Sequence, residues 1–307
     1  MAAIAVSLVL ATAAAGAAGP PSAGELRRAT ERFLAQQSTA TDGRATSGGT
    51  GGRVVGDPLP ANRVVAFYGA PQMGQTILGM RTPAVAARKL AAQSAPYASL
   101  GDRPVVGEFD LVSVFATAGG GPDGLYRSRQ SDDVIEIYLE QARASGARLM
   151  LDIQPGRSSF AAEIAALGDW IAEPDVDVAL DPEWNVGRRG IPGRTPGEVT
   201  AKEVNAASRS LAATVRGDDL PPKLLVVHQF RRGMVRGRTK IKSRRGVQVV
   251  LNFDGIGSPA PKRAGYAALS TTTLFNGFSL FYQRDTPVMK PGSVLALEPA
   301  PDLLLYQ

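Results

Sequence analysis

The sequence predicts an α/β protein with the fold of a (β/α)8 TIM barrel, and three observations support this prediction. Short apolar runs alternate with helical segments from residue 63 to the end of the chain, a pattern typical of βαβ units in a parallel sheet. Eight such runs fall within 245 residues, close to the roughly 250 that this barrel needs. No glycine-rich nucleotide-binding motif follows the first run, which disfavours an open doubly wound sheet.

Each predicted strand is a short apolar run bounded by polar or turn-forming residues, as in strands that are buried on both faces. The eight strands are predicted at Val64–Tyr68, Val105–Phe115, Arg148–Ile153, Val176–Leu180, Lys223–Phe230, Val247–Phe253, Gly277–Tyr282 and Asp302–Tyr306.

Helices are predicted where apolar residues recur at helical spacing between the strands. They lie at Pro83–Leu100, Asp132–Ser145, Ser159–Ala172 and Ala201–Arg216. The helical pattern is weakest after the fifth and seventh strands. The eighth strand ends the chain, so we expect a barrel that lacks a regular last helix.

The N-terminal part has a different composition. Residues 2–18 are apolar and rich in small side chains, so residues 1–24 resemble a secretory signal peptide without its basic start, or else an N-terminal membrane anchor. We expect a secreted or envelope-associated protein. Residues 25–62 are predicted to hold a short helix at Glu25–Gln37 and then a flexible linker, which leaves 63–307 as the barrel domain.

Composition and charge narrow the classes of partner. There is no cysteine, which excludes disulfides, cysteine-ligated metals and a lipid-modified cysteine anchor. The net charge is +6, and residues 231–245 hold eight Lys or Arg and no acid. This basic segment is either a solvated loop or a binding surface for an anionic polymer. It lacks interleaved aromatic residues, so nucleic-acid binding is not expected.

The fourth predicted strand ends in a group of polar residues. Barrel enzymes keep their active sites at the C-terminal ends of the strands, and this strand runs into Asp181, Glu183 and Trp184. Alternation along an extended strand predicts both carboxylates on one face, roughly 6–7 Å apart. Pro182 has no amide hydrogen and is predicted to end the regular pairing.

Other strand ends add polar and aromatic side chains to the same edge. Glu108 and Asp110 lie inside the second strand and are expected to point into the barrel lumen. Any one of these residues also has a structural explanation, such as a loop cap, an ion-pair partner or a hydrogen-bonded core histidine, so the prediction rests on their recurrence at strand ends. The remaining candidates are Tyr68, Asp152, Gln154, Arg157, His228, Gln229, Asp254, Tyr282 and Arg284.

Carboxylates beside aromatic residues favour glycoside hydrolysis, in which one acid protonates the leaving oxygen and a second carboxylate assists. Glu183 is predicted to be the general acid, because burial raises a carboxyl pKa. Asp181 would be its partner, Asp152 or Asp254 the opposing carboxylate, and His228 a further catalytic residue. Residues predicted to bind substrate are Tyr68, Gln154, Arg157, Trp184, Gln229, Tyr282 and Arg284. No cofactor or metal is expected, although the four acids Asp152, Asp181, Glu183 and Asp254 could hold Mg²⁺ or Ca²⁺.

Four segments resemble a family of extracellular actinobacterial barrel proteins, some of which occur beside cell-wall-binding repeats. They are Asp152–Arg157, Leu180–Trp184, Val227–Phe230 and the final Leu-Leu-Tyr-Gln. The resemblance covers residues 63–307 and implies a barrel at the cell envelope, but no reaction.

A weaker similarity links Asp181, Glu183 and Trp184 to chitinase-type glycosidases, whose fourth strand ends in Asp-x-Glu and an aromatic residue. It implies that Glu183 is the acid and that Asp181 steers a substrate acetamido group. The two earlier aspartates of that motif correspond to Val176 and Ala179 here, so the similarity does not extend to substrate-assisted cleavage.

These observations predict an exported, monomeric glycosidase that acts on an envelope or extracellular polysaccharide. Two alternatives remain. One is a non-catalytic barrel that binds cell-wall glycan through the basic segment, and the other is a metal-assisted phosphodiester hydrolase. Contact with a membrane is expected only through an uncleaved N-terminal segment.

Overall fold

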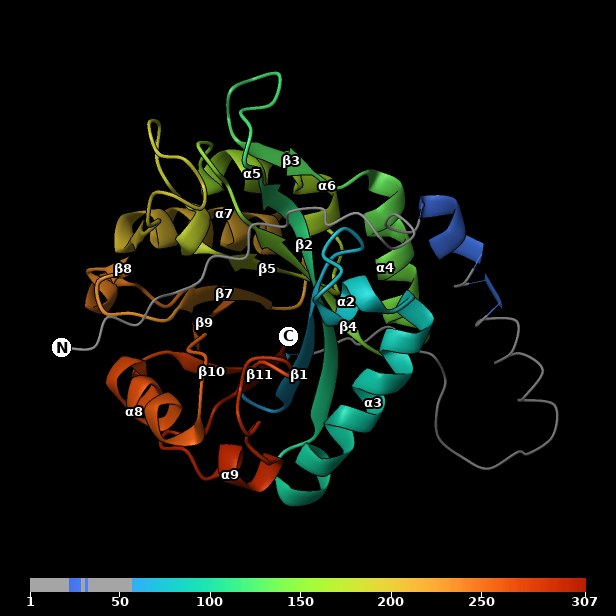
Figure 1. The fold of residues 1–307 in the computed structure, drawn as a ribbon, viewed down its shortest axis with the longest axis vertical. Coiled ribbons are helices and arrows are strands. Elements are labelled where there is room, and N and C mark those ends of the chain that lie inside the picture. Colours follow the sequence, from blue (N-terminus) through green and yellow to red (C-terminus); the bar gives the residue numbers. More distant parts are fainter. Residues whose placement is uncertain (1–21, 29–30, 33–56) are drawn as a thin grey trace.

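The computed structural model describes residues 22–28, 31–32 and 57–307, and eight parallel strands form a closed barrel within the last range (Figure 1). Each strand pairs with its neighbours along the chain, and the last pairs with the first. The predicted (β/α)8 barrel is confirmed. Its strands are β1 (Arg63–Gly69), β2 (Val105–Ala116), β4 (Arg148–Ile153), β5 (Val176–Leu180), β7 (Lys223–Gln229), β9 (Val247–Phe253), β10 (Phe275–Leu280) and β11 (Leu303–Tyr306).

The sequence located most strands to within one residue. β4, β5 and β9 begin and end where they were predicted, whereas β10 lies two residues before its predicted position. A short strand, β3 (Arg127–Arg129), pairs antiparallel with the C-terminal end of β2 and forms a hairpin with it at the barrel rim. This hairpin was not predicted.

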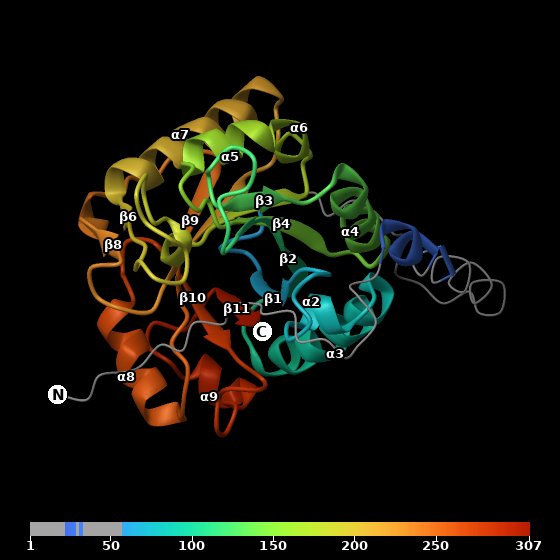
Figure 2. The same ribbon diagram turned by 45° about the horizontal axis from the view of Figure 1, so that its top comes forward.

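The helices lie outside the ring of strands (Figure 2). The predicted helix at 159–172 is divided at Leu167. Between β7 and β9, the described chain forms only β8 (Val235–Arg236) and a 3₁₀ turn, which agrees with the weak helical pattern of this segment. The helices are α2 (Ile77–Met80), α3 (Pro83–Leu100), α4 (Asp132–Ala144), α5 (Phe160–Ala166), α6 (Gly168–Ile171), α7 (Ala201–Gly217), α8 (Pro259–Leu269) and α9 (Pro291–Leu295).

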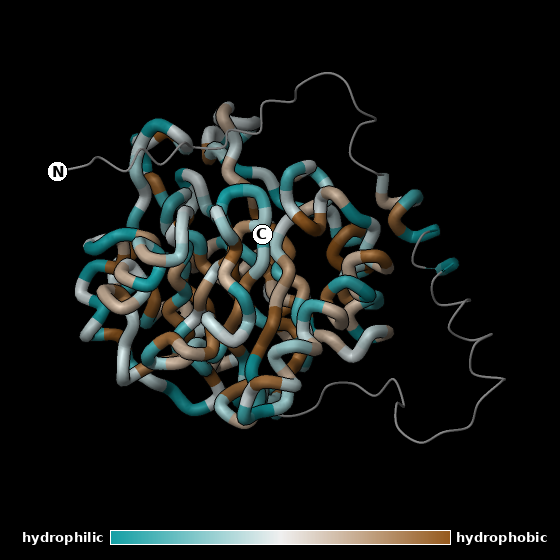
Figure 3. Tube along the Cα trace, turned by 60° about the horizontal axis from the view of Figure 1, so that its bottom comes forward, coloured by the Kyte–Doolittle hydropathy of each residue, from teal (hydrophilic) through white to brown (hydrophobic). Residues whose placement is uncertain are grey.

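Apolar segments gather in the middle of the molecule, and hydrophilic ones lie mainly toward its outside (Figure 3). On the outer face of β11, Tyr306 is fully buried and its hydroxyl lies 2.6 Å from that of Tyr97 on α3. α3 therefore covers the strand at which the barrel closes. α9 packs against α3 on the same side.

The folded domain begins earlier than predicted. Residues 57–62 were assigned to the flexible linker, but Leu59 is fully buried and its amide donates a 3.0 Å hydrogen bond to Gln248 on β9. Buried Pro58 and Leu59, together with hydrogen bonds from Gln248 and Arg103, hold this segment against the barrel.

The N-terminal segment is described only in part. Residues 23–28 and 31–32 are helical, and Arg27 forms a 2.8 Å ion pair with Glu136 of α4. The rest of the predicted helix at 25–37 and residues 1–21 of the predicted signal segment lie outside the described residues. Among those that are described, no helix is long and apolar enough to cross a membrane.

Candidate active site at the C-terminal mouth of the barrel

The register of the strands shows which side chains point into the lumen. Tyr68 is opposite Asp110, and His228 is opposite Asn252. Side chains alternate along each strand and stay in register across a sheet, so each pair shares one face. Asp110 and His228 meet although β2 and β7 are not neighbours, which places all four side chains in the lumen. The lumen of this barrel is thus lined by polar groups toward the C-terminal ends of the strands, which we call the mouth.

His228 is held on one side by a hydrogen-bonded group of three residues from β9, its following loop and β10. Its Nδ1 lies 2.7 Å from Asp254 Oδ2. Asn252 donates to the other Asp254 oxygen at 2.6 Å and to the Ser279 hydroxyl at 2.8 Å. Ser279 in turn donates a short hydrogen bond to Asp254. These contacts fix the ring plane of His228 and the carboxylate of Asp254.

The other side of His228 faces two buried carboxylates. Nε2 lies 3.3 Å from Asp152 Oδ2, close enough for attraction but without the geometry of a hydrogen bond. Asp110 lies beside them, and no carboxylate oxygen of Asp110 or Asp152 has a hydrogen-bond partner among the described residues. We call Asp110, Asp152 and His228 the buried cluster.

Burial and the charge of Asp152 raise the pKa of Asp110. Burial and the charge of Asp254 raise the pKa of Asp152, although His228 opposes this rise. Burial alone would lower the pKa of His228, but the neighbouring Asp254 and Asp152 outweigh it, so that pKa is raised well above its ordinary value. The expectation that Asp110 points into the lumen is confirmed. The contact of Asp110 with Asp152 and His228 was not predicted. The sequence does not show which lumen residues of different strands lie at the same depth along the barrel axis.

Asp181 and Gln154 connect the buried cluster to the rim. The amide of Gln154 donates to the Tyr68 hydroxyl at 3.1 Å and to Asp181 at 3.4 Å. Burial, followed by the charges of Asp152 and Glu183, raises the pKa of Asp181 well above its usual range. Tyr68 is almost fully buried, so it supplies a hydroxyl here and not the open ring face predicted for stacking on a sugar.

Glu183 lies on a 3₁₀ turn, Pro182–Trp184, that follows β5. Regular strand structure stops at Leu180, as Pro182 predicted. The prediction that Asp181 and Glu183 share one strand face is therefore wrong, because the extended conformation ends before either residue. The turn is held by Gly197, whose amide donates to the Glu183 carbonyl at 3.0 Å.

The surroundings of Glu183 shift its titration. The side chain is partly buried, and burial together with the charge of Asp254 raises its pKa to about 7. His228, Arg284 and Arg231 oppose this rise with their positive charges. Arg284 is exposed in the loop after β10, and Arg231 donates to the Gly197 carbonyl at 2.9 Å. Glu183 can therefore exchange a proton near neutral pH.

Three residues predicted to bind substrate point elsewhere. Gln229 is on the outer face of β7 and donates to the Leu269 carbonyl at 3.2 Å. Tyr282 stacks on Tyr306 and donates to Gln93 of α3 at 2.5 Å. Arg157 donates to the Gly190 carbonyl at 2.7 Å, and its guanidinium lies 4.0 Å above the ring of Tyr126. These three side chains hold helices and loops together.

Of the aromatic residues predicted to stack on sugars, Tyr282 is 42% exposed and Trp184 also lies at the rim. Trp184 is partly exposed and follows Glu183 on the same turn. Tyr126 is also partly exposed, in the loop after β2, and was not predicted. The loops that carry these last two rings adjoin, since Gly156 pairs with Asn185 and a Cβ added to Gly156 would lie 2.4 Å from the Tyr126 carbonyl oxygen.

A deeper layer of the lumen holds a buried ion pair. Arg148 Nε lies 2.6 Å from Asp177 Oδ2, and both side chains are fully buried. Glu108 lies beside them, and burial and the charge of Asp177 raise its pKa well above its usual range. Glu108 points into the lumen as expected, but toward this ion pair and away from the mouth.

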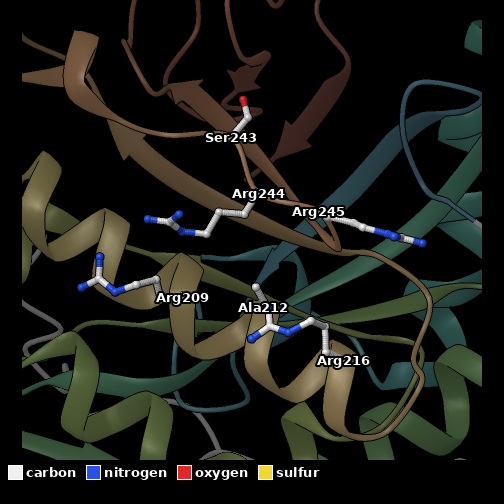
Figure 4. A pocket seen from close by; sticks show the side chains of 6 residues that line it. All are labelled: Arg209, Ala212, Arg216, Ser243, Arg244 and Arg245. Carbon is white, nitrogen blue, oxygen red and sulfur yellow. The ribbon is translucent and has the colours of Figure 1, made fainter.

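Two surface hollows lie along α7, away from the residues of the mouth. The larger, about 530 Å³, is lined by Arg209, Ala212 and Arg216 of α7 and by Ser243, Arg244 and Arg245 (Figure 4). The second, about 360 Å³, adds Lys202, Lys240 and Lys242. None of the residues that line either hollow is acidic, so both are basic.

Comparison with known proteins gives no further guide to the chemistry, since no family model, curated protein or solved structure matches this chain.

Proposed function

We propose that the protein is a glycoside hydrolase that acts on an extracellular or cell-envelope polysaccharide. The observation that carries this proposal is the pair Glu183 and Asp254 at the mouth of the barrel. One is a partly buried carboxyl whose pKa is raised to about 7. The other is held by His228, Asn252 and Ser279. Two carboxyl groups in such unlike environments suit the acid and the carboxylate of glycoside cleavage.

Each residue then has a role. Glu183 donates its proton to the leaving glycosidic oxygen, because at neutral pH a large fraction of it is protonated. Asp254 is the opposing carboxylate, and it suits this role better than Asp152 because its side chain is 13% exposed whereas that of Asp152 is fully buried. Asp181 and Gln154 orient the polar groups beneath the substrate, and Trp184 offers a face for a sugar ring.

Reducing-end release from a panel of polysaccharides tests this proposal. The panel should include neutral, N-acetylated and uronate-containing polymers. Glu183→Gln removes the acid without changing the size of the side chain, and we expect turnover to fall by roughly 10²–10⁴-fold. Glu140→Gln, on the exposed face of α4, is the matched control and should keep full activity. Equal rates for the two variants would contradict the assignment of Glu183.

A second function, binding of an anionic polymer without cleavage, is favoured by the basic hollows along α7. Arg209, Arg216, Arg244 and Arg245 line one hollow, and no acid is among its lining residues. Exposed charge of one sign attracts polyanions in a manner that salt screens. This function predicts binding to a uronate polymer that weakens steeply between 50 and 500 mM salt and is lost in Arg209→Gln/Arg244→Gln. An affinity that changes neither with salt nor with the two substitutions would exclude this function.

A further inference from the structure

We propose that the buried cluster of Asp110, Asp152 and His228 binds one divalent transition-metal ion. This inference goes beyond the proposed glycosidase function and does not depend on it. Each residue offers one ligand atom, and the three atoms lie within 4.8 Å of one another. Nitrogen and carboxylate oxygens bind Zn²⁺ at about 2.0–2.2 Å, so two ligand atoms on one ion are at most about 4.4 Å apart. The cluster is already close to that size.

The three side chains of the buried cluster are deeply buried. Asp110 and Asp152 are fully buried, and His228 is 3% exposed. Within the described part of the chain, neither the carboxylate oxygens of the two aspartates nor His228 Nε2 makes a hydrogen bond. Buried polar atoms nearly always have partners, and buried carboxylates are paired or bind metals. A cation between these atoms would satisfy all three side chains at once.

His228 is oriented as metal-binding histidines are. Its Nδ1 lies 2.7 Å from Asp254 Oδ2, and that carboxylate is itself held by Asn252 and Ser279. Histidine ligands usually donate the hydrogen of their other ring nitrogen to a carboxylate, which fixes the tautomer and directs the free nitrogen at the metal. Here the other nitrogen is Nε2, which faces Asp152, and a bound metal ion would displace its proton.

The charge balance of the mouth also calls for a cation. Five acids gather there, namely Asp110, Asp152, Asp181, Glu183 and Asp254, and they lie close enough for their negative charges to repel one another. His228 is the single basic side chain within this group, because Arg231 and Arg284 act from the rim. A divalent ion would offset two of these charges at the most deeply buried point.

The ligand types identify the class of metal. Mg²⁺ and Ca²⁺ prefer oxygen ligands alone, whereas one imidazole with two carboxylates suits Zn²⁺ or Mn²⁺. We therefore expect Zn²⁺ and Mn²⁺ to bind more tightly than Mg²⁺. The earlier candidate set of Asp152, Asp181, Glu183 and Asp254 does not form this site, because Asp254 contacts the opposite side of the His228 ring.

Titration of the chelator-treated, full-length protein with ZnCl₂, MnCl₂ and MgCl₂ tests the site directly. Isothermal calorimetry should give one Zn²⁺ or Mn²⁺ per chain with a Kd below 10 μM. The thermal midpoint should rise by about 5 °C or more at a hundredfold excess over Kd. Failure of the unaltered protein to bind either ion would overturn the proposal, whatever the outcome of the polysaccharide assays.

Matched variants then locate the bound ion. Asp110→Asn and Asp152→Asn should each weaken binding at least tenfold, and Asp254→Asn should weaken it by about 10–100-fold through the loss of its support for His228. Glu108→Gln is the control, since Glu108 is equally buried on the same strand and also lacks hydrogen bonds to its carboxylate oxygens. Equal affinity in the Asp110, Asp152 and Glu108 variants would show that the ion binds elsewhere and overturn the site.

Discussion

At the scale of single residues, Glu183 couples proton binding to the stability of the fold. Its pKa is raised from 4.5 to about 7 in the folded protein, so between these values the folded state keeps a proton that the unfolded chain releases. Stability must then fall as pH rises through this window. A shift of this size, discounted for partial exposure, corresponds to a loss on the order of 2 kcal/mol.

Urea unfolding of the chelator-treated protein at pH 4.5 and pH 8 measures this effect. Glu183→Gln has no such proton to lose, so it should lose about 2 kcal/mol less than the unaltered protein over the same change of pH. Other titrating groups are common to both proteins and cancel in the comparison. The same loss in both would contradict a raised pKa at Glu183.

Individual site residues were predicted with uneven success, for a physical reason. Asp152, Asp181, Glu183, His228 and Asp254 do meet at one end of the barrel, because parallel strands all end on the same side. Gln229 was predicted to bind substrate, but it points outward. It directly follows the lumen-facing His228, and successive side chains of a strand point to opposite faces. Ser279 was missed because a small hydroxyl inside an apolar strand gives no signal in the sequence.

At the scale of elements, the turn after β5 depends on a close approach by the loop that precedes α7. A Cβ at Gly197 would lie 2.2 Å from the Pro182 carbonyl oxygen and 2.3 Å from that of Glu183. Gly197→Ala must therefore push the turn away and move the Glu183 side chain. We expect a loss of activity of about tenfold or more, because misplacement of a catalytic group by 1 Å can cost about 10²-fold.

The control for this variant is Gly217→Ala at the end of α7, where an added Cβ meets nothing within 4 Å. The Gly217→Ala variant should retain full activity, and the pKa of Glu183 should not change in it. Unchanged turnover in Gly197→Ala would show that the position of the turn does not matter to the reaction.

The elements themselves were predictable to the extent that their patterns are local. Apolar runs gave the eight strands, and helical spacing gave α3, α4 and α7 to within one residue. The β3 hairpin and the small sheet formed by β6 (Val199–Thr200) and β8 were not predicted. These strands are two or three residues long, and tertiary contacts between loops create them.

Across the whole molecule, a polar lumen runs through an interior that is otherwise largely apolar. The ion pair between Arg148 and Asp177 lies in its deeper layer, where both side chains are fully buried. Removal of one partner leaves the other charge uncompensated, so Arg148→Met should destabilise the protein by about 3–5 kcal/mol. Urea unfolding measures the change.

The double variant Arg148→Met/Asp177→Asn separates loss of the ion pair from loss of packing. It carries no unpaired charge at either position, so we expect it to be more stable than Arg148→Met alone. If the losses in unfolding free energy of the two single variants instead add up in the double variant, the ion pair has no coupling energy. That result would contradict the stabilising role of the ion pair in the lumen.

Glu183 is proposed to act as a general acid at the mouth, and the pH dependence of kcat/KM for polysaccharide cleavage tests this claim. This quantity reports the titration of groups in the free enzyme, so activity should fall above pH 7 as Glu183 loses its proton. Arg284→Gln removes a positive charge that lowers the pKa of Glu183 and should move this descending limb to higher pH. A profile without a descending limb near pH 7, or a limb that Arg284→Gln leaves in place, would contradict the claim.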